Sequence, residues 1–384
     1  MSNGHAILAP SAFERTVPCP GSVGLSIPYL DLPRTDEQIE GDMAHWIALH
    51  VAAGRVFTVG ELIQPWNLPA TQEMLFGAEL WAAVVGTNGT AEKSVNISRI
   101  HTHCWGTPDN RQLSAELKNG LRILDVYDYK FGHKYVEVFE NFQVLAYAVG
   151  VLDELGLYDA DIWVRLTIVQ PRSYHRTGPV RVYEIRADQL RALANIIHTS
   201  AWQAVDESGK PRPNAPTKAG PHCEHCPARH ECVTLQRAGL SIIEATGTAD
   251  VANLPPDALG FELAYVQRSI KLLEARETGL AAQAEALLRS GKRVPGYMME
   301  PKTAREAWLP NTSVDEVAAL GDMIGVDLRK SADLITPTQA RTALKARKIE
   351  PTIIDQYAKR PQGAMALVRD TNIEARKAFG GTSK

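Results

Sequence analysis

The stretch RILDVYDYKFGHK, residues 122–134, decides the fold because it reads as a buried strand that ends in charge. Residues at i and i+2 of a strand point to the same face of the sheet, so Asp128 and Lys130 would lie side by side. An unpaired charge in a dry core is costly. The two side chains therefore form either a plain ion pair at the end of a strand or part of a catalytic site.

The bulk composition is that of an ordinary globular chain, with 384 residues, 45% of them hydrophobic and 22% charged. This length allows two domains, or one large domain with an appendage. No apolar run approaches the roughly 20 residues that a membrane span needs. The first residues also lack the basic start and apolar stretch of a signal peptide. We therefore expect a cytoplasmic protein with no membrane partner.

Hydrophobic spacing and turn residues divide the chain into two predicted domains, residues 1–240 and 241–384. In the first, helices are predicted at 37–54, 70–85, 137–155 and 187–206, and strands at 93–100, near 104–105, at 120–130, 161–171 and 180–186. After Gly239, long Ala/Leu/Glu/Arg patterns predict a mainly helical region with helices at 257–291 and 337–348. The fold class is therefore α/β, with a helical accessory region.

The C-terminal part is mildly basic, although the whole chain has a net charge of −3. Residues 287–384 hold 17 Lys and Arg against 11 Asp and Glu, which suits contact with a polyanion. A helix beginning near Pro337 would place Arg341, Lys345 and Lys348 on one face, where they could follow a DNA backbone. A solvated helix surface is the alternative interpretation.

Three of the five cysteines lie in CEHCPARHEC, a C-x2-C-x5-C arrangement formed by Cys223, Cys226 and Cys232. So short a spacing in a cytoplasmic protein favours metal binding over disulfides. Cys19, far upstream in VPCPGS, would complete four thiolates, which suits a [4Fe–4S] cluster that ties residue 19 to residue 232. A structural zinc site, completed by one of the nearby histidines 222, 225 or 230, is the alternative.

A second feature accompanies the Asp128/Lys130 pair, because GTPD places Asp109 at the end of another strand-like run. An Asp from one strand and a D-x-K from its neighbour can converge on one divalent cation, for which Mg²⁺ prefers carboxylate oxygens. A lysine there can act on a water molecule or stabilise developing phosphate charge. This is the chemistry of phosphodiester hydrolysis, although D-x-K alone is a weak signal.

Five elements in the same order resemble the PD-(D/E)XK nuclease superfamily. They are the G-x-x-x-H of Gly41 to His45, Asp109 in GTPD, Asp128-Tyr129-Lys130, the Q-x-x-x-Y of Gln143 to Tyr147, and the set of one N-terminal and three C-terminal cysteines that closes the domain. Within the superfamily the sequence is similar to RecB-type exonucleases that carry an iron–sulfur cluster, including the CRISPR-associated member that trims spacer ends. It also looks like a phage and prophage protein family of this type.

The resemblance implies a restriction-endonuclease-like core, a mixed central sheet flanked by helices, closed by the iron–sulfur clasp. His45, Asp109 and Asp128 would hold Mg²⁺ or Mn²⁺, Lys130 would act on water, and Gln143 and Tyr147 would touch substrate or orient the lysine. The basic stretch KFGHK adds Lys134 as a possible phosphate contact. The chain would then be a metal-dependent DNA exonuclease acting on single strands or duplex ends.

The biological setting implied is phage or bacterial recombination, repair or replication. No G-x-x-x-x-G-K-[ST] motif occurs, so unwinding would need a partner such as a helicase, and a recombination or annealing protein is another candidate partner. Two alternatives are a nucleic-acid-binding or assembly module that has lost catalysis, and a redox-sensing DNA-binding protein whose cluster is the functional element. Glu116-x-Lys118 is a second motif of the same form, which we interpret as a decoy because it follows Asp109 too closely.

Overall fold

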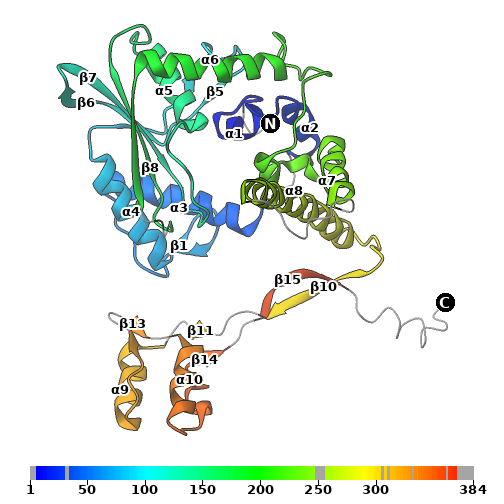
Figure 1. Ribbon diagram of the computed structural model, residues 1–384. Helices are drawn as coiled ribbons and strands as arrows, with labels where there is room; N and C mark the ends of the chain where they lie inside the picture. The colour runs from blue at the N-terminus through cyan, green and yellow to red at the C-terminus, as the bar shows by residue number, and fades with distance from the viewer. Residues whose placement is uncertain are drawn as a thin grey trace. The chain divides into compact units, whose positions relative to one another are not determined.

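A computed structural model describes residues 6–30, 34–173, 175, 177–246, 256–303, 307–308, 312–330, 333–334, 336–359 and 362–369. The chain forms two compact units, residues 1–279 and 280–384. Each unit is described by itself. Figure 1 shows the elements of both.

The first unit is built on a five-stranded mixed sheet, as the sequence predicts. In spatial order the strands are β3 (Thr90–Ala91), β6 (Asn110–Lys118), β7 (Leu121–Tyr129), β8 (Trp163–Val169) and β9 (Val180–Arg186). Only β7 and β8 are parallel to each other. Their connection is the helix α5 (Phe142–Glu154), which follows from the need of parallel neighbours for a long crossover.

Helices cover both faces of this sheet (Figure 1). On one face, α5 and α6 (Ala187–Ala204) pack on alternate residues of the central strands, such as Val126 and Leu166. On the other face, α3 (Asp36–Ala52) and α4 (Gln72–Val85) pack on Tyr127 and Tyr129. The period of two along β7 thus sends Leu124, Val126 and Asp128 toward α5 and the tyrosines toward α3 and α4.

Several short elements lie before and between these helices and strands. They are η1 (Pro10–Ala12), α1 (Phe13–Thr16), α2 (Ser22–Ser26), η2 (Ile27–Tyr29), the pair β1 (Leu62–Ile63) and β2 (Leu68–Pro69), and the pair β4 (Val95–Asn96) and β5 (Trp105–Gly106). Strand β6 was not predicted. It continues directly from Asp109 and joins β7 through Asn119 and Gly120, both with positive φ.

The cysteine segment forms η3 (Pro221–His225) and η4 (Pro227–His230), followed by α7 (Val233–Thr246) and the long α8 (Pro256–Arg289). Leu235 of α7 and Leu272 and Ala275 of α8 form a small core with Cys223. This packing explains why the first unit extends to Gly279, whereas the sequence predicted a division at residue 240.

The second unit contains helices and antiparallel ribbons. A core that includes Val317, Leu328, Leu344 and Ile354 joins α9 (Val314–Ile324), α10 (Pro337–Ala346) and η5 (Pro351–Ile354). The ribbons pair β10 (Tyr297–Thr303) with β15 (Gln362–Arg369), β11 (Ala307–Trp308) with β14 (Ala358–Lys359), and β12 (Arg329–Lys330) with β13 (Asp333–Leu334). The sequence predicted α10 but none of these ribbons.

Over the described residues, no helix combines the length and the apolar character needed to cross a lipid bilayer.

Candidate active site

The β6–β7 hairpin brings Asp109 next to Asp128. Asn110 is paired with Tyr127, so the residue before Asn110 lies opposite the residue after Tyr127. The Asp109 carboxylate accepts a hydrogen bond from the backbone N–H of Tyr129 at 2.6 Å, which fixes it against the end of β7. The sequence predicted this convergence of Asp109 with the D-x-K motif, but from a strand ending at Asp109 rather than one that starts there.

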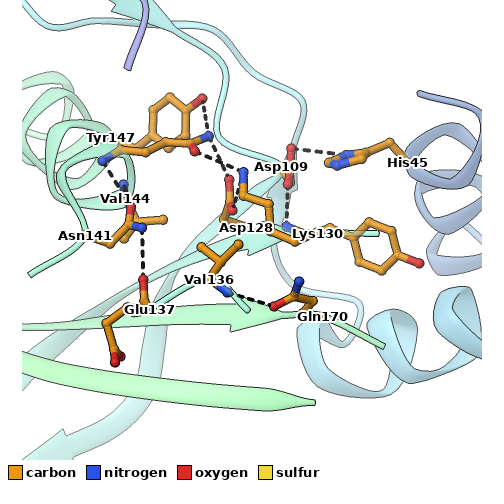
Figure 2. A network of polar contacts seen from close by, with 12 residues as sticks. His45, Asp109, Asp128, Lys130, Val136, Glu137, Asn141, Val144, Tyr147 and Gln170 are labelled. Atoms are coloured by element: carbon orange, nitrogen blue, oxygen red, sulfur yellow. Dashed lines mark hydrogen bonds and ion pairs between the residues drawn. The ribbon is translucent and has the colours of Figure 1, made fainter. Parts of the chain in front are cut away.

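A polar network joins the end of β7 to the first turn of α5 (Figure 2). Lys130 Nζ lies 2.9 Å from Asp128 Oδ2 and donates to Gln143 Oε1 at 3.0 Å. Gln143 Nε2 donates to Asp128 Oδ1 at 3.0 Å and contacts the Tyr147 hydroxyl at 3.3 Å. The structure therefore brings together the four residues of the two predicted motifs, D-x-K and Q-x-x-x-Y.

Local structure explains why Gln143 and Tyr147 face this point. Asn141 caps α5, and its side-chain oxygen accepts from the N–H groups of Gln143 and Val144, which sets where the helix begins. Residues four apart on a helix share a face, so Gln143 and Tyr147 both point at Asp128. Figure 2 shows Tyr147, Asp128 and Lys130 converging from α5 and β7.

The buried charges of the site influence one another. Burial alone would lower the pKa of Lys130, but the negative charges of Asp128 and Asp109 outweigh it and raise that pKa. Burial raises the pKa of Asp109, and the charge of Asp128 adds to this, whereas His45, Lys130 and the Tyr129 N–H oppose it. Lys130 is thus held as a cation between two carboxylates.

His45, Glu92 and Asp109 form a group that could hold a metal ion, since one ligand atom from each lies within 4.8 Å of the others. His45 Nδ1 lies 3.6 Å from Asp109 Oδ1, and the His45 ring meets the Tyr129 ring edge-on at 5.1 Å. Helix α3 presents the histidine because its buried residues, such as Ala44 and Ile47, fix which face turns to the sheet. Imidazole with carboxylates is a donor set that suits a divalent cation.

Glu92 was not predicted as part of the site. It follows the edge strand β3 and adopts a left-handed backbone with φ of 50°. Its N–H donates to the Asp109 carbonyl at 3.2 Å. Desolvation and then the Asp109 charge raise the pKa of Glu92 to about 7, against an opposing effect of His45. No motif marks this residue in the sequence. Asp128, the third metal ligand predicted, instead turns its carboxylate to Lys130 and Gln143.

The second predicted motif of the D-x-K form lies away from this site. Glu116 pairs with Arg165 at 3.0 Å, and Lys118 pairs with Glu184 and lies 4.0 Å from the centre of the Trp163 ring. These contacts are made across strands of the sheet, toward the turn of the β6–β7 hairpin. Glu116 and Lys118 therefore belong to a surface ion-pair network.

Four cysteines gather where the N-terminal segment meets the cysteine segment. The Cys19 sulfur accepts from the Lys218 N–H at 3.4 Å, and the Cys223 sulfur accepts from the Gly220 N–H at 3.4 Å. Burial raises the pKa of the Cys19 thiol, and the charges of Cys226 and Cys232 add to it. All five cysteines are free, with no disulfide between them.

The spacing of these sulfurs bears on which metal they could hold. Within the part of the chain described, the ligand atoms of His45, Glu92 and Asp109 lie within 4.8 Å of one another. No three of the cysteine sulfurs come that close together. Tetrahedral zinc with Zn–S bonds of about 2.3 Å would bring its thiolates to about 3.8 Å from one another. Cys104 lies elsewhere, buried in the core under α5, where burial raises its pKa.

The predicted DNA-contacting residues have mixed surroundings. Lys134 Nζ pairs with Glu224 at 2.6 Å and lies 3.0 Å from His225 Nε2. Arg341 pairs with Asp355 at 2.7 Å. Lys345 is exposed in the last turn of α10, whereas Lys348 follows the helix with φ of 60°, so the predicted row of three does not continue along one helix face.

One comparison with known proteins identifies a family. The sequence model of a family described as a protein of unknown function, DUF2800, matches residues 81–374, and the chain belongs to this family. The matched region contains Glu92, Asp109, Asp128 and Lys130. Cys19 and His45 lie before it.

Proposed function

We propose that this DUF2800 member is a metal-dependent DNA exonuclease of the PD-(D/E)XK type, similar to RecB-type enzymes. The observation that carries the proposal is the convergence of Asp109, Asp128 and Lys130 across one hairpin, beside the metal-binding group of His45, Glu92 and Asp109. These five residues come from four separate segments of the chain, since Asp128 and Lys130 both lie at the end of β7. Their meeting at one end of a mixed sheet supports a site rather than a chance motif.

The divalent cation, when bound, would polarise the phosphodiester and lower the pKa of a water molecule. His45, Glu92 and Asp109 would hold it through an imidazole nitrogen and carboxylate oxygens. Asp128 orients Lys130, whose ammonium stabilises negative charge as it develops on the phosphate. Gln143 fixes Asp128 and Lys130 at once, because its amide donates to the carboxylate and accepts from the ammonium. Tyr147 limits the positions that Gln143 can take.

The four cysteines support a structural [4Fe–4S] cluster. Four thiolates are the ligand set of such a cluster, and a structural zinc site is the alternative. Backbone N–H groups already point at the sulfurs of Cys19 and Cys223. The cluster would tie the N-terminal segment to η3 and η4, and hydrolysis needs no redox step from it.

The intact Asp109, Asp128 and Lys130 favour an active enzyme over a module that has lost catalysis. The substrates proposed are single strands or duplex ends in phage or bacterial recombination, repair or replication. A helicase or an annealing protein would supply the DNA.

The deciding experiment is a gel assay with 5′- and 3′-labelled single- and double-stranded DNA in Mg²⁺, Mn²⁺ or EDTA. We expect stepwise shortening from an end that requires metal and is lost in Asp128→Asn. Asp125→Asn is the matched control, since Asp125 is a buried aspartate on the same strand that points to the opposite face. Absence of cleavage by the wild-type protein with either metal, or equal cleavage by Asp128→Asn, would reject the proposal.

A further inference from the structure

A hollow of about 340 Å³ lies beside the candidate active site, at the edge strand of the sheet. Its lining comes from the segment 135–139, which leads from the site to α5, from Thr177, and from residues 180–183 of β9. We call it the β9 hollow. Its volume is at the small end of the range for ligand pockets. The nuclease chemistry proposed above does not use any of its residues.

Aromatic side chains form one wall of the β9 hollow. Phe139 is a large hydrophobic residue that is 57% exposed. Its ring meets the Tyr183 ring edge-on with centroids 4.9 Å apart. Tyr135, at the other side, carries the Arg181 guanidinium over its ring at 4.7 Å. Exposed rings with an arginine nearby are the components of a stacking platform for unpaired bases.

Arg181 gives the β9 hollow a positive charge. Arg181 is only 4% exposed, its Nε atom has no hydrogen-bond partner, and among the described residues it makes no ion pair. Its polar contacts are the Gln170 side-chain oxygen at 2.7 Å and the Gly178 carbonyl at 3.3 Å. Glu137 is close enough to act on it, but the Glu137 oxygens accept from the Val138 and Phe139 N–H groups and from the Tyr135 hydroxyl. A buried, unpaired cation is costly unless a ligand compensates it.

The sheet register relates the β9 hollow to the catalytic residues. Asp128 is the neighbour of Ile168 on β8, and Ile168 is the neighbour of Arg181 on β9. All three therefore share the face that α5 covers. Two strand spacings separate Asp128 from Arg181, about 10 Å. A stacked DNA strand covers this distance with about three nucleotides, and an extended strand covers it with fewer.

Hydrogen bonds of Gln170 connect the β9 hollow to the segment that follows Lys130. It accepts from Arg181 and from the Val136 N–H, and it donates to the carbonyls of Gly132 and Lys134 at 2.7 Å each. Figure 2 shows Gln170 and Val136 beneath the Asp128–Lys130 pair. The segment that follows the catalytic lysine is thus held on the same residue that holds Arg181.

We propose that the β9 hollow binds one unpaired nucleobase of the DNA strand whose backbone leads to the metal site, so that the substrate is single-stranded there. This rests on the proposed nuclease function. The base stacks on Phe139 and Tyr183, and the Arg181 charge attracts the polyanionic strand. A base held in a duplex cannot enter, because its faces are covered by its neighbours.

Binding is tested without catalysis, by fluorescence anisotropy in EDTA with full-length protein. The probes are a fluorescein-labelled 20-mer of thymidylate and a blunt 20-base-pair duplex. Phe139→Ala should bind the single strand about 5- to 150-fold more weakly, the loss expected for one base–aromatic stack. Its duplex affinity should stay within about twofold, and Phe139→Trp should restore single-strand affinity, because any large aromatic face serves.

Phe76→Ala is the matched control, since Phe76 has the same 57% exposure but lies on α4. It should leave both affinities unchanged. A scan with single abasic sites should find one position at which the wild-type protein binds as weakly as Phe139→Ala, and the variant should lose nothing further there.

The inference fails if the wild-type protein binds no single strand, or if Phe139→Ala binds it as tightly as the wild type does. It also fails if Phe139→Ala loses as much affinity for the duplex as for the single strand, or if Phe139→Trp binds as weakly as Phe139→Ala. These outcomes are separate from those of the nuclease assay. If single-strand binding depends on Phe139 but the protein does not cleave DNA, the nuclease proposal is rejected and the base-binding site is retained. If the protein cleaves DNA and Phe139 has no effect on binding, the nuclease proposal is retained and the base-binding site is rejected.

Discussion

The β6–β7 hairpin carries two motifs of the form acid-x-Lys, one near each end. At one end, Asp128 is 2% and Lys130 26% exposed, and both bond to Gln143 of a helix that closes over them. At the other, Glu116 is 71% and Lys118 35% exposed, and each pairs with a residue of β8 or β9. The residue types are nearly the same, but their acidic neighbours differ. Asp109, beside the first pair, is fixed by the Tyr129 N–H. Glu184, beside Lys118, is also bound to Arg165.

This difference indicates that the proposed chemistry depends on burial and on the contacts with Gln143, rather than on the motif alone. A charge pair in water is screened and contributes little. A pair taken out of water acts strongly on any charge that enters the same space. The first motif meets these conditions, and the second one is a surface ion pair.

The largest expected effect is on catalysis. Lys130→Met should lower the DNA cleavage rate by at least about 10²- to 10³-fold, because it removes the cation that stabilises charge developing on the phosphate. Lys118→Met, the same change at the other motif, should leave the rate within about twofold. The measurement is the single-turnover rate on labelled DNA in Mn²⁺. Equal losses in the two variants would remove the distinction between the motifs.

Two buried cysteines in different surroundings, Cys19 and Cys104, allow a similar comparison. Cys19→Ser should lose iron and the broad absorption of an iron–sulfur protein, since it removes one of four thiolate ligands. Cys104→Ser should keep both, because Cys104 lies in the core under α5. Metal analysis and absorption spectra of the purified proteins give the answer. About one zinc and no iron in the wild type would replace the cluster with a zinc site.

Glu92 tests whether the metal group is the one that the structure brings together. Glu92→Gln should weaken Mn²⁺ binding by about tenfold or more, because it removes a carboxylate charge from the group with His45 and Asp109. Glu116→Gln is the matched control and should not change it. Calorimetric titration without DNA measures the affinity directly. Unchanged affinity in Glu92→Gln would leave Asp128, the ligand predicted from the sequence, as the better candidate.

The sequence was sufficient where one local rule governs the structure. A helix start is predicted by Thr336, Pro337 and Gln339, and α10 begins at Pro337 with a capping box formed by Thr336 and Gln339. The apolar period of two around Asp128 placed β7 to within a residue at each end. The β6 strand was missed although Asn119-Gly120 is a strong hairpin signal, because the exposed part of β6 has no clean alternation.

Other features depend on contacts that no local pattern contains. Glu92 joins the site through the pairing of the edge strand β3 with β6, which is decided by tertiary structure. The ribbon of β10 and β15 joins residues that are 59 to 72 positions apart, from Thr303 with Gln362 to Tyr297 with Arg369. The cysteine spacing predicted a metal site, but the contribution of α7 and α8 to its surroundings followed only from packing.

The smallest effect concerns the third acidic residue of the hairpin, Asp125, which lies between the two motifs. It is buried, and desolvation raises its pKa to about 6 even though Arg165 lies 3.4 Å away and opposes the shift. The ordinary value is about 3.9. The folded protein therefore binds this proton more tightly than the unfolded chain does. Stability from this group is fully present below about pH 4 and is lost as the pH rises through about 6.

Asp125→Asn removes this titration, so its free energy of unfolding should equal that of wild type near pH 4 and exceed it above pH 6. Two pKa units correspond to a difference on the order of 2–3 kcal/mol. Urea unfolding at pH 4, 5, 6 and 7 measures it. Glu116→Gln, which removes an exposed partner of the same arginine, should change stability by less than about 1 kcal/mol at each pH. If Asp125→Asn is destabilised at pH 7, the ion pair with Arg165 outweighs burial, and Asp125 belongs with the surface network rather than with the buried charges around Asp128.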